Sequence, residues 1–435
     1  MHTATEPQRI LVIGAGYVGL VTAVGFASMG HDVGVVERGS ERYEALVAGR
    51  VPIFEAGLQE AFDAAVAAGR LRVLPTPSGR PDMVMVCVGT PIGADGRSDL
   101  SQLRSALADL HEVFTTDAPL IIRSTLPPGA TRLAVQWSGV PQASVLTNPE
   151  FLRQGTALAD FLKPSRVVIG HFPDADPAVI ERVATLYQAM DAPLLIMDVA
   201  AAEIAKNGAN AFLALKLSFA NEIASVAEEF GTDVDVVMSA IALDPRIGGL
   251  YMRPGLGFGG SCLPKELRAL AVSGMERGLP MLVTNAASEA NHAQQARFAA
   301  RIDALTGGVA GRTVGLLGLA FKAHTDDVRD SPPLAVARTL IERGATVMAH
   351  DPQAGANALR ELPELHLCAS PEATLDGAHI AVIGTEWPIY RDLDWAAIRP
   401  SLRSPIVLDG RRLLDADLLR GLGYQYETVG TAPGA

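Results

Sequence analysis

Short apolar runs separated by helical patterns mark the first part of the chain. Apolar runs at Ile10–Ile13 and Val33–Val36 predict buried strands, and a helical pattern at Val21–Met29 lies between them. Three further runs also predict strands: Met83–Val88, Leu120–Arg123 and Val145–Leu146. Strands that alternate with helices indicate a parallel sheet with right-handed crossovers.

The pattern changes after residue 197. An alanine- and leucine-rich helical stretch runs from Asp198 to Phe230, and further helical patterns continue to about Ala304. A second alternating region follows, with a helix at Leu334–Arg343 and strands at Thr313–Leu317, Thr346–His350, Ile380–Ile383 and Ile406–Leu408. We therefore expect an α/β protein: two Rossmann-like parallel-sheet domains, 1–197 and 305–435, joined by a long central helix and a helical middle domain, 198–304.

Composition narrows the functional classes. The 435 residues carry a formal net charge of -12, so the chain has no overall basic footprint for nucleic acid or an anionic membrane. No apolar run reaches the roughly 18 residues that a membrane span needs, and the first residues lack the apolar core of a signal peptide. Only three cysteines are present, which favours a reducing compartment. We expect a cytoplasmic protein without a metal site.

A glycine triplet follows the first predicted strand. Gly14, Gly16 and Gly19, with Tyr17 and Val18 between the last two, stand between this strand and a helix. This context is typical of a dinucleotide site, in which the pyrophosphate lies at the helix N-terminus. Glu37 ends the next strand, where a carboxylate can bind the ribose hydroxyls and repel a 2′-phosphate. NAD is therefore favoured over NADP, although Arg38 and Arg42 leave NADP open.

A second glycine-rich segment, Gly257–Lys265, carries a cysteine. Its glycines let backbone N–H groups approach a ligand, and Cys262 follows them directly, with Lys265 three residues later. A neighbouring cation lowers the pKa of a thiol and makes the cysteine a better nucleophile. Cys262 is therefore the candidate nucleophile, whereas Cys87 and Cys368 are expected to be buried structural thiols.

The chain resembles the UDP-glucose/GDP-mannose dehydrogenase family over nearly its whole length. The resemblance is carried by these segments: GAGYVGL at Gly14–Leu20, VPIFEAGL at Val51–Leu58, VGTP at Val88–Pro91, STLPPG at Ser124–Gly129, NPEFLRQGTA at Asn148–Ala157, AKNGANAFLALK at Ala205–Lys216, RIG at Arg246–Gly248, GFGGSCLPK at Gly257–Lys265, GLAFKAHTDDVRDSP at Gly318–Pro332, TEW at Thr385–Trp387 and DGRRLLD at Asp409–Asp415.

The resemblance implies an N-terminal NAD domain, a central dimerisation helix and a C-terminal nucleotide-sugar domain. It also implies a four-electron oxidation of a sugar C6 alcohol to a carboxylate with two NAD in succession. In this reaction a cysteine thiolate would capture the aldehyde and hold it through a thioester. A tethered intermediate keeps the reactive aldehyde from escaping. The expected assembly is a homodimer or a higher homo-oligomer.

The family's catalytic residues carry over to six positions: Cys262, Lys206, Asn210, Glu150, Thr125 and Glu266. Lys206 and Asn210 are spaced i, i+4 and project from one helix face. Lys206 would act as an acid/base or stabilise an oxyanion at C6, with Asn210 as a second donor. Glu150 would handle a water that Thr125 helps to orient, a role that rests mainly on the resemblance.

Binding residues carry over in the same way. The cofactor residues implied are Gly14, Gly16, Tyr17, Val18, Gly19, Glu37, Arg42, Gly89, Thr90, Ser124, Thr125, Gln154, Lys265 and Arg329. The substrate residues implied are Glu150, Phe151, Leu152, Lys206, Asn210, Arg246, Tyr251, Arg253, Gly257, Phe258, Gly259, Phe321, Lys322 and Arg411. In the family, Arg246 would reach the substrate across the dimer interface.

Two positions depart from the family pattern. Glu266 stands where the family usually has aspartate, so one extra methylene shifts a carboxylate near the cysteine. Gln154 stands where the family usually has glutamate, which removes a charge near the cofactor. Neither change removes the candidate nucleophile, but both can alter affinity or rate.

The identity of the sugar nucleotide stays open. The RIG, TEW and DGRRLLD segments resemble the UDP-glucose branch, whereas Tyr251–Gly255 and Ser218–Glu222 resemble the GDP-mannose branch. The N-acetylated-sugar branches commonly carry histidine before the cysteine, where this chain has Ser261. UDP-glucose is therefore the first choice and GDP-mannose the second. A non-catalytic nucleotide-sugar sensor is a further alternative, against which Cys262 and Lys206 argue.

Overall fold

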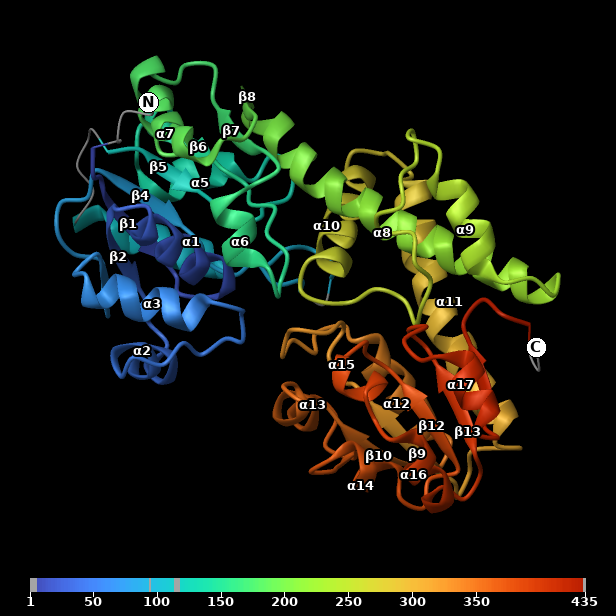
Figure 1. Cartoon of the computed structure of the whole chain (residues 1–435). Helices are drawn as coiled ribbons and strands as arrows, with labels where there is room; N and C mark the ends of the chain where they lie inside the picture. Colours follow the sequence, from blue (N-terminus) through green and yellow to red (C-terminus); the bar gives the residue numbers. More distant parts are fainter. Residues whose placement is uncertain (1–5, 94, 113–117, 433–435) are drawn as a thin grey trace. The chain divides into compact units, whose positions relative to one another are not determined.

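The computed structural model describes residues 6–93, 95–112 and 118–432. The chain divides into two compact units (Figure 1). Unit 1 comprises Met1–Ala209 with Arg268–Leu279, and unit 2 comprises Asn210–Leu267 with Pro280–Ala435. The boundary falls inside two helices, α8 (Val199–Glu229) and α10 (Leu263–Met275), so each unit is described by itself.

Unit 1 is built on an eight-stranded sheet with the order β3-β2-β1-β4-β5-β6-β7-β8. Its strands are β1 (Arg9–Ile13), β2 (Asp32–Val36), β3 (Leu71–Leu74), β4 (Met83–Val86), β5 (Leu120–Ile122), β6 (Val145–Thr147), β7 (Val167–His171) and β8 (Leu194–Asp198). All neighbours pair in parallel except β6 and β7, which are antiparallel. The order from β3 to β6 is that of a Rossmann fold, whose ligands bind beyond the carboxyl ends of the strands.

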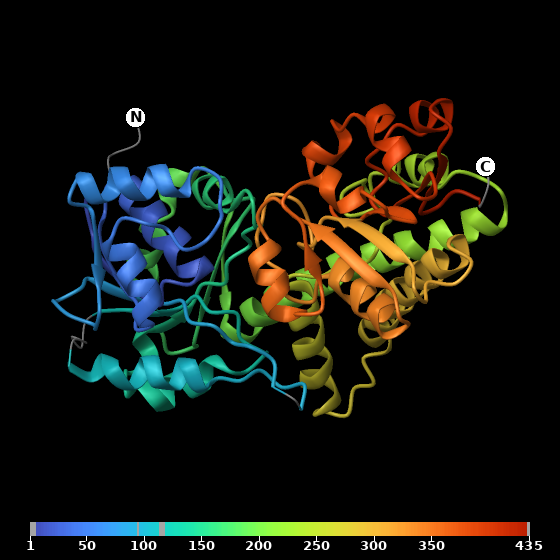
Figure 2. The same ribbon diagram turned by 90° about the horizontal axis from the view of Figure 1, so that it is seen from below.

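Helices cover both faces of this sheet, as Figure 2 shows for the blue-to-green unit. They are α1 (Tyr17–Ser28), α2 (Ser40–Val47), α3 (Leu58–Ala67), α4 (Ser101–Ala108), α5 (Thr131–Ser138), α6 (Ala157–Leu162) and α7 (Pro177–Thr185). In β1, Ile10 and Val12 pack with α1 and α3, whereas Leu11 and Ile13 pack with α4 and α5. A strand buried on both faces has an unbroken apolar run, which is why β1 was predictable.

Unit 2 holds a six-stranded, wholly parallel sheet with the order β11-β10-β9-β12-β13-β14. Its strands are β9 (Thr313–Leu317), β10 (Thr346–His350), β11 (His366–Leu367), β12 (Ile380–Ile383), β13 (Ile406–Asp409) and β14 (Gln425–Thr428). The helices that begin in the second half of the chain are α9 (Val234–Ala242), α10, α11 (Leu282–Leu305), α12 (Pro332–Glu342), α13 (Gly355–Glu361), α14 (Pro371–Leu375), α15 (Pro388–Arg391), α16 (Trp395–Ile398) and α17 (Ala416–Gly421). Val314 and Leu316 of β9 pack with α11 and α12, and Leu317 packs on the other side with Trp395.

The predicted fold class is confirmed: two parallel-sheet regions, a long helix α8 and a helical middle region are present. Helix α1 begins at Tyr17, four residues before the predicted Val21, because the third glycine lies inside the helix rather than before it. Strand β4 ends at Val86, not at Val88. Five strands were not predicted: β3, β7, β8, β11 and β14. Across the described residues, every helix is too short or too polar to span a bilayer.

Candidate functional site

The glycine turn joins β1 to α1 in unit 1. Gly14 has φ +97°, a left-handed conformation that favours glycine. A Cβ on Gly19 would overlap the Gly14 carbonyl oxygen, so the third glycine lets α1 approach the turn. A Cβ on Gly16 would meet nothing within 4 Å, which leaves open space at the N-terminus of α1. Space and helix polarity together fit the pyrophosphate of NAD.

Glu37 lies beside this turn, just after β2. Its carboxylate accepts the Ala15 N–H at 3.2 Å and the Gly39 N–H at 2.8 Å, and Arg42 lies 3.6 Å away. Arg38 instead contacts Asp109 and donates to the Ser105 hydroxyl at 2.9 Å. The predicted Glu37 and Arg42 are therefore brought together with the glycine turn, and Arg38 is engaged elsewhere.

The carboxyl ends of β4 and β5 bring four predicted cofactor residues together. The Thr90 hydroxyl donates to the Thr125 carbonyl at 2.8 Å, and the Ser124 hydroxyl donates to the Val88 carbonyl at 2.7 Å. Gly89 stands between Val88 and Thr90, the two residues of the first loop that make these contacts. The two hydroxyls thus join the loop after β4 to the loop after β5. These contacts hold the edge of the sheet where a Rossmann fold binds its ligand.

Glu55 is a buried residue that sequence reasoning did not assign, although it stands in the quoted VPIFEAGL segment. Its carboxylate accepts the Gly155 N–H at 2.7 Å and the Ala157 N–H at 2.8 Å, at the start of α6. The Tyr17 hydroxyl also donates to it. Glu55 therefore joins the predicted Tyr17 to the loop that carries Gln154. A carboxylate in an otherwise apolar segment was the available signal.

Glu150 and Lys206 form a buried ion pair. Each side chain is only 3% exposed, and Lys206 Nζ lies 3.3 Å from Glu150 Oε1. The Leu152 N–H donates to Oε2 at 2.5 Å. Burial alone would raise the pKa of Glu150, but Lys206, the Leu152 N–H and Arg123 outweigh it and hold this pKa below 4.5. Glu150 is therefore a buried carboxylate that stays charged at neutral pH.

Arg123, 5% exposed, interacts electrostatically with Glu150 and was also missed. Its Nε donates to the Thr22 hydroxyl at 2.9 Å, and its Nη1 donates to Asn148. Asn148 in turn accepts the Tyr187 hydroxyl at 2.6 Å and donates to the Val168 carbonyl at 2.8 Å. This fully buried network fixes the start of the NPEF segment. The basic residue directly after β5 was its only sequence signal.

Unit 2 carries the candidate nucleophile. Cys262 is half-buried and stands directly before α10, where its carbonyl accepts the Glu266 N–H at 2.9 Å. The Ser261 hydroxyl lies 3.6 Å from the Cys262 sulfur. The N-terminal end of a helix favours negative charge, so this position suits a thiolate.

Asn210 and Glu266 meet in unit 2. The Asn210 amide donates to Glu266 Oε2 at 2.7 Å, and Glu266 is 1% exposed. Glu266, which stands where the family usually has aspartate, therefore contacts Asn210, another predicted catalytic residue. The structure brings Asn210, Glu266 and the start of α10 together, a contact that the sequence did not predict.

The glycine loop packs closely on the segment after β9. A Cβ on Gly259 would overlap the Asp330 carbonyl oxygen, and one on Gly260 would lie 2.8 Å from the Phe321 ring. The Gly260 N–H donates to the Arg329 carbonyl at 2.8 Å. The predicted residues Gly259, Phe321 and Arg329 are thus neighbours, and glycine is required because the backbones touch.

Three buried amide side chains clamp the other end of the loop. Asn291 accepts the Phe258 N–H at 2.7 Å and donates to the Phe258 carbonyl at 3.0 Å. Gln294 donates to the Gly255 carbonyl at 2.7 Å, and Asn221 accepts the Gly255 N–H at 2.8 Å. None of these amides was assigned from the sequence. Their signal was polar residues on the buried faces of two long helices, α8 and α11.

The remaining predicted substrate residues differ in their exposure and in their contacts within the chain. Arg411 donates to the Gly384 carbonyl at 2.7 Å and to the Phe321 carbonyl at 2.8 Å. Arg253 is exposed and donates to the Arg412 carbonyl at 2.6 Å. Arg246 is 87% exposed and pairs with Asp244 at 2.6 Å, so within one chain it lies outside these clusters. Tyr251, Lys322, Gly257 and Lys265 are half-buried residues of unit 2.

Within the described part of the chain, none of the three cysteines forms a disulfide. Cys87 is buried behind the glycine turn, and burial raises the pKa of its thiol to about 12, as expected for a structural thiol. The prediction for Cys368 was wrong: it is half-exposed, because it follows the short, exposed strand β11.

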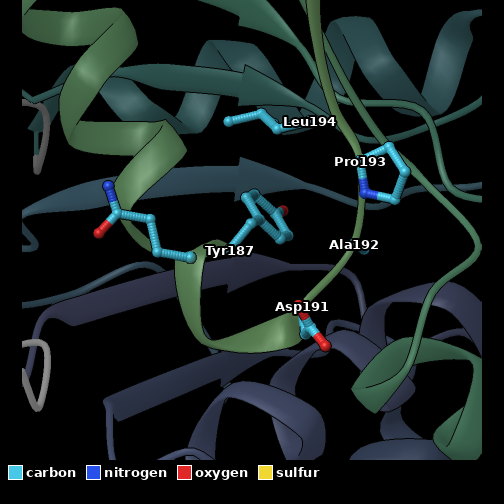
Figure 3. A pocket seen from close by; sticks show the side chains of 6 residues that line it. Tyr187, Asp191, Ala192, Pro193 and Leu194 are labelled. Carbon is cyan, nitrogen blue, oxygen red and sulfur yellow. The ribbon is translucent and has the colours of Figure 1, made fainter. Parts of the chain in front are cut away.

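A pocket in unit 1 lies away from the predicted residues. It is lined by Tyr187, Gln188, Asp191, Ala192, Pro193 and Leu194, at the start of β8 (Figure 3). None of them was assigned a role, and the Tyr187 hydroxyl already donates a hydrogen bond to Asn148. The chemistry-bearing residues therefore lie elsewhere.

The Rossmann-type sheet with an NAD-compatible turn places the chain among the dinucleotide-binding proteins. Residues 8–191, 200–293 and 315–416 match the NAD binding domain, the central domain and the UDP binding domain of one family. The chain belongs to the UDP-glucose/GDP-mannose dehydrogenase family, and NAD is its cofactor.

Named relatives agree with this assignment. The chain is 37% identical to a UDP-glucose 6-dehydrogenase of Pseudomonas aeruginosa, over 97% of both chains. It is 35% identical to the UDP-glucose 6-dehydrogenase of Rhizobium meliloti, over 97% of this chain and 99% of the relative. The solved UDP-glucose dehydrogenase of the archaeon Pyrobaculum islandicum is 39% identical, with a TM-score of 0.89 over 99% of this chain and 100% of that one.

Proposed function

We propose that the chain is a UDP-glucose 6-dehydrogenase that converts UDP-glucose to UDP-glucuronate. The observation that carries the reaction is the buried Glu150–Lys206 pair, which occurs in one chain with a half-buried cysteine at a helix start. The choice of UDP-glucose rests on the full-length relatives that bear this name. GDP-mannose remains the second choice.

The first oxidation converts the C6 alcohol to an aldehyde. NAD, when bound, accepts the hydride from C6. The Lys206 ammonium and the Asn210 amide would then stabilise the developing oxyanion. The hydroxyl proton would pass to water, because an ammonium is already protonated and cannot accept it. A buried ammonium suits this role because little solvent screens its charge.

The second oxidation requires the thiol. The Cys262 thiolate would add to the aldehyde carbon to form a thiohemiacetal, which loses a second hydride from C6 and a proton to become a thioester. Water then attacks the thioester, releases the thiolate and leaves the carboxylate. Glu150 would accept the proton of this water, with Thr125 helping to orient it. Two NAD are reduced for each sugar.

Glu37 would set the preference for NAD over NADP. Its carboxylate repels a 2′-phosphate, and the engagement of Arg38 with Asp109 leaves that arginine less suited to bind one. Equal kcat/KM values for NAD and NADP would contradict this assignment.

Assembly along α8 is part of the proposal. Four apolar side chains on this helix are exposed in a single chain: Ile204, Phe212, Phe219 and Val226. A stripe of this kind fits a second copy of the chain, and Arg246 would then complete the partner's site. A fully active monomer in light scattering at assay concentration would contradict it. The three-domain division and the cytoplasmic location stay predictions.

A substrate panel tests the proposal directly. The protein is incubated with NAD and, separately, UDP-glucose, GDP-mannose and a UDP-N-acetylhexosamine, and NADH is followed by absorbance. We expect the highest kcat/KM with UDP-glucose and two NADH for each uronate formed. A higher value with GDP-mannose would reassign the substrate. Binding of UDP-glucose without NADH formation would favour the sensor alternative.

A further inference from the structure

The direction of β7 places an arginine at the ligand-binding edge of unit 1. Strand β7 runs antiparallel to β6, with Thr147 opposite Gly170. The first residue of β7 therefore lies at the edge where the parallel strands β4, β5 and β6 end. Arg166 directly precedes Val167, the first residue of this strand. If β7 ran parallel to β6, Arg166 would lie at the opposite edge of the sheet, where the parallel strands begin.

Arg166 stacks on a residue of the NPEF segment. Its guanidinium carbon lies 3.6 Å from the centroid of the Phe151 ring. The ammonium of Lys206, the partner of Glu150, lies 5.4 Å from the same centroid. Phe151 thus carries two cations within reach of one ring, directly after the candidate base. The contact fixes Arg166 beside the predicted substrate residues Glu150, Phe151 and Leu152.

No carboxylate of the described residues neutralises Arg166. Within the described part of the chain its side chain donates one hydrogen bond, to the Ser165 hydroxyl at 3.2 Å, and no acidic group lies within 4.0 Å. The neighbouring arginines differ, since Arg153 pairs with Asp160 at 2.6 Å and Arg182 lies 3.8 Å from Asp82. Partial burial without an anion lowers the pKa of Arg166.

A partly desolvated guanidinium without a counter-ion is costly unless a ligand supplies the anion. Its five N–H donors form a planar fork that matches phosphate and carboxylate oxygens. The chain has a net charge of -12, so positive charge next to the candidate site is not explained by a generally basic surface. The ligand of the proposed reaction carries a diphosphate, and its product also carries a carboxylate.

We propose that Arg166 is an anion-binding residue of the nucleotide-sugar site and takes an oxyanion group of the ligand while stacked on Phe151. The group is the diphosphate or the carboxylate that the reaction makes. This inference rests on the proposed function, because that function names the ligand. The stack holds the fork in one orientation, so little side-chain entropy is lost when the anion binds.

Calorimetry on the full chain tests the inference with three probes: UDP, UDP-glucose and UDP-glucuronate. We expect Arg166→Gln to weaken binding about tenfold, the usual effect of one charge-assisted hydrogen bond. Arg166→Lys keeps the charge but loses the fork and should fall between wild type and Arg166→Gln. The matched control is Lys163→Gln, which removes an exposed charge three residues away and should bind like wild type. Circular dichroism and the milder Arg166→Lys variant guard against a folding defect.

The pattern across the probes decides the outcome. Weaker binding of all three assigns Arg166 to the diphosphate, and weaker binding of UDP-glucuronate alone assigns it to the carboxylate. Unchanged binding of all three overturns the inference, as does a fall in kcat with no change in any dissociation constant, which would mean that Arg166 only positions Phe151. The wild-type protein separates the two proposals: without UDP binding and NADH formation the proposed function itself fails.

Discussion

The two units hold their parts of the candidate site by different means. In unit 1 the reactive carboxylate is held by charge: Glu150 pairs with Lys206, and the positive charge of Arg123 also stabilises it. In unit 2 the loop that leads to Cys262 is held by neutral groups: Asn221, Asn291 and Gln294 bind its backbone.

The difference matches the chemistry proposed for each part. Glu150 must stay charged in a buried site, which requires compensating cations and hydrogen-bond donors. Cys262 would pass through thiolate, thiohemiacetal and thioester, so its surroundings must hold geometry while the charge on sulfur changes. Amide-to-backbone bonds do this because their strength does not depend on the sulfur's charge. The comparison predicts that pH affects the unit 1 arrangement and leaves the clamp in unit 2 unchanged.

The largest effect is expected from Cys262→Ser. A serine hydroxyl is a much weaker nucleophile than a thiolate, so uronate formation should fall by about 10³-fold or more. The first hydride transfer needs no thiolate, and aldehyde can still form slowly. Product analysis by mass spectrometry measures both compounds, with Cys368→Ser as the matched control. Uronate formation at a near wild-type rate would refute the covalent mechanism.

Lys206→Met should produce the next largest change. Removing one partner of a buried pair typically costs about 3–5 kcal/mol at neutral pH. The folded-state pKa of Glu150 lies below 4.5, so the pair stabilises the fold above that pH and loses this contribution as the pH falls through the folded pKa. In the variant, Glu150 becomes protonated and neutral on acidification. The free-energy cost of burying its unpaired charge then disappears.

Urea unfolding from pH 4 to pH 8 measures this difference. The gap between Lys206→Met and wild type should narrow towards pH 4, whereas the exposed control Lys163→Met should show almost no gap at any pH. A constant gap across the range would mean that Lys206 acts by packing and not by charge.

How far the sequence predicted these features depends on whether a feature is local. Strands β9, β10 and β12 were predicted residue for residue, because apolar runs buried on both faces need no knowledge of their neighbours. The edge strands β3, β8 and β11 are short or half-exposed and give weak patterns. Strand β7 is buried, yet its reversed direction depends on pairing with β6, which no local pattern encodes.

The candidate site divides in the same way. Segments such as Gly14–Gly19 and Gly257–Lys265 combine turn and chemistry in adjacent residues and were recognisable. Arg123, Glu55 and Asn291 form hydrogen bonds with groups 25 to 102 residues away, so only the folded chain reveals them. Arg166 belongs to this second kind.

Glu150→Gln should lower turnover by about 10²–10³-fold, the usual effect of losing a general base. The variant keeps the thiol, so both hydride transfers can proceed while thioester hydrolysis slows. A covalent adduct should then accumulate and appear as a mass increase on the Cys262 peptide. Glu60→Gln, on the exposed face of α3, is the control. Slow turnover without any adduct would spare the covalent mechanism but remove Glu150 from its role in hydrolysis.

The smallest effect, and the one that best separates the two units, is expected from Asn291→Leu. Leucine has a similar volume but leaves the Phe258 N–H and carbonyl without their partner, which costs about 2 kcal/mol in stability. The loop then holds Cys262 less firmly, and we expect kcat for uronate to fall about tenfold. Because the clamp is neutral, the loss of unfolding free energy, measured by urea unfolding, should be the same from pH 5 to pH 8. The corresponding loss for Lys206→Met should change with pH. The exposed neighbour His292→Ala is the matched control. A loss that varies with pH as strongly as that of Lys206→Met would break the comparison, since it would mean that charge also holds the loop of unit 2.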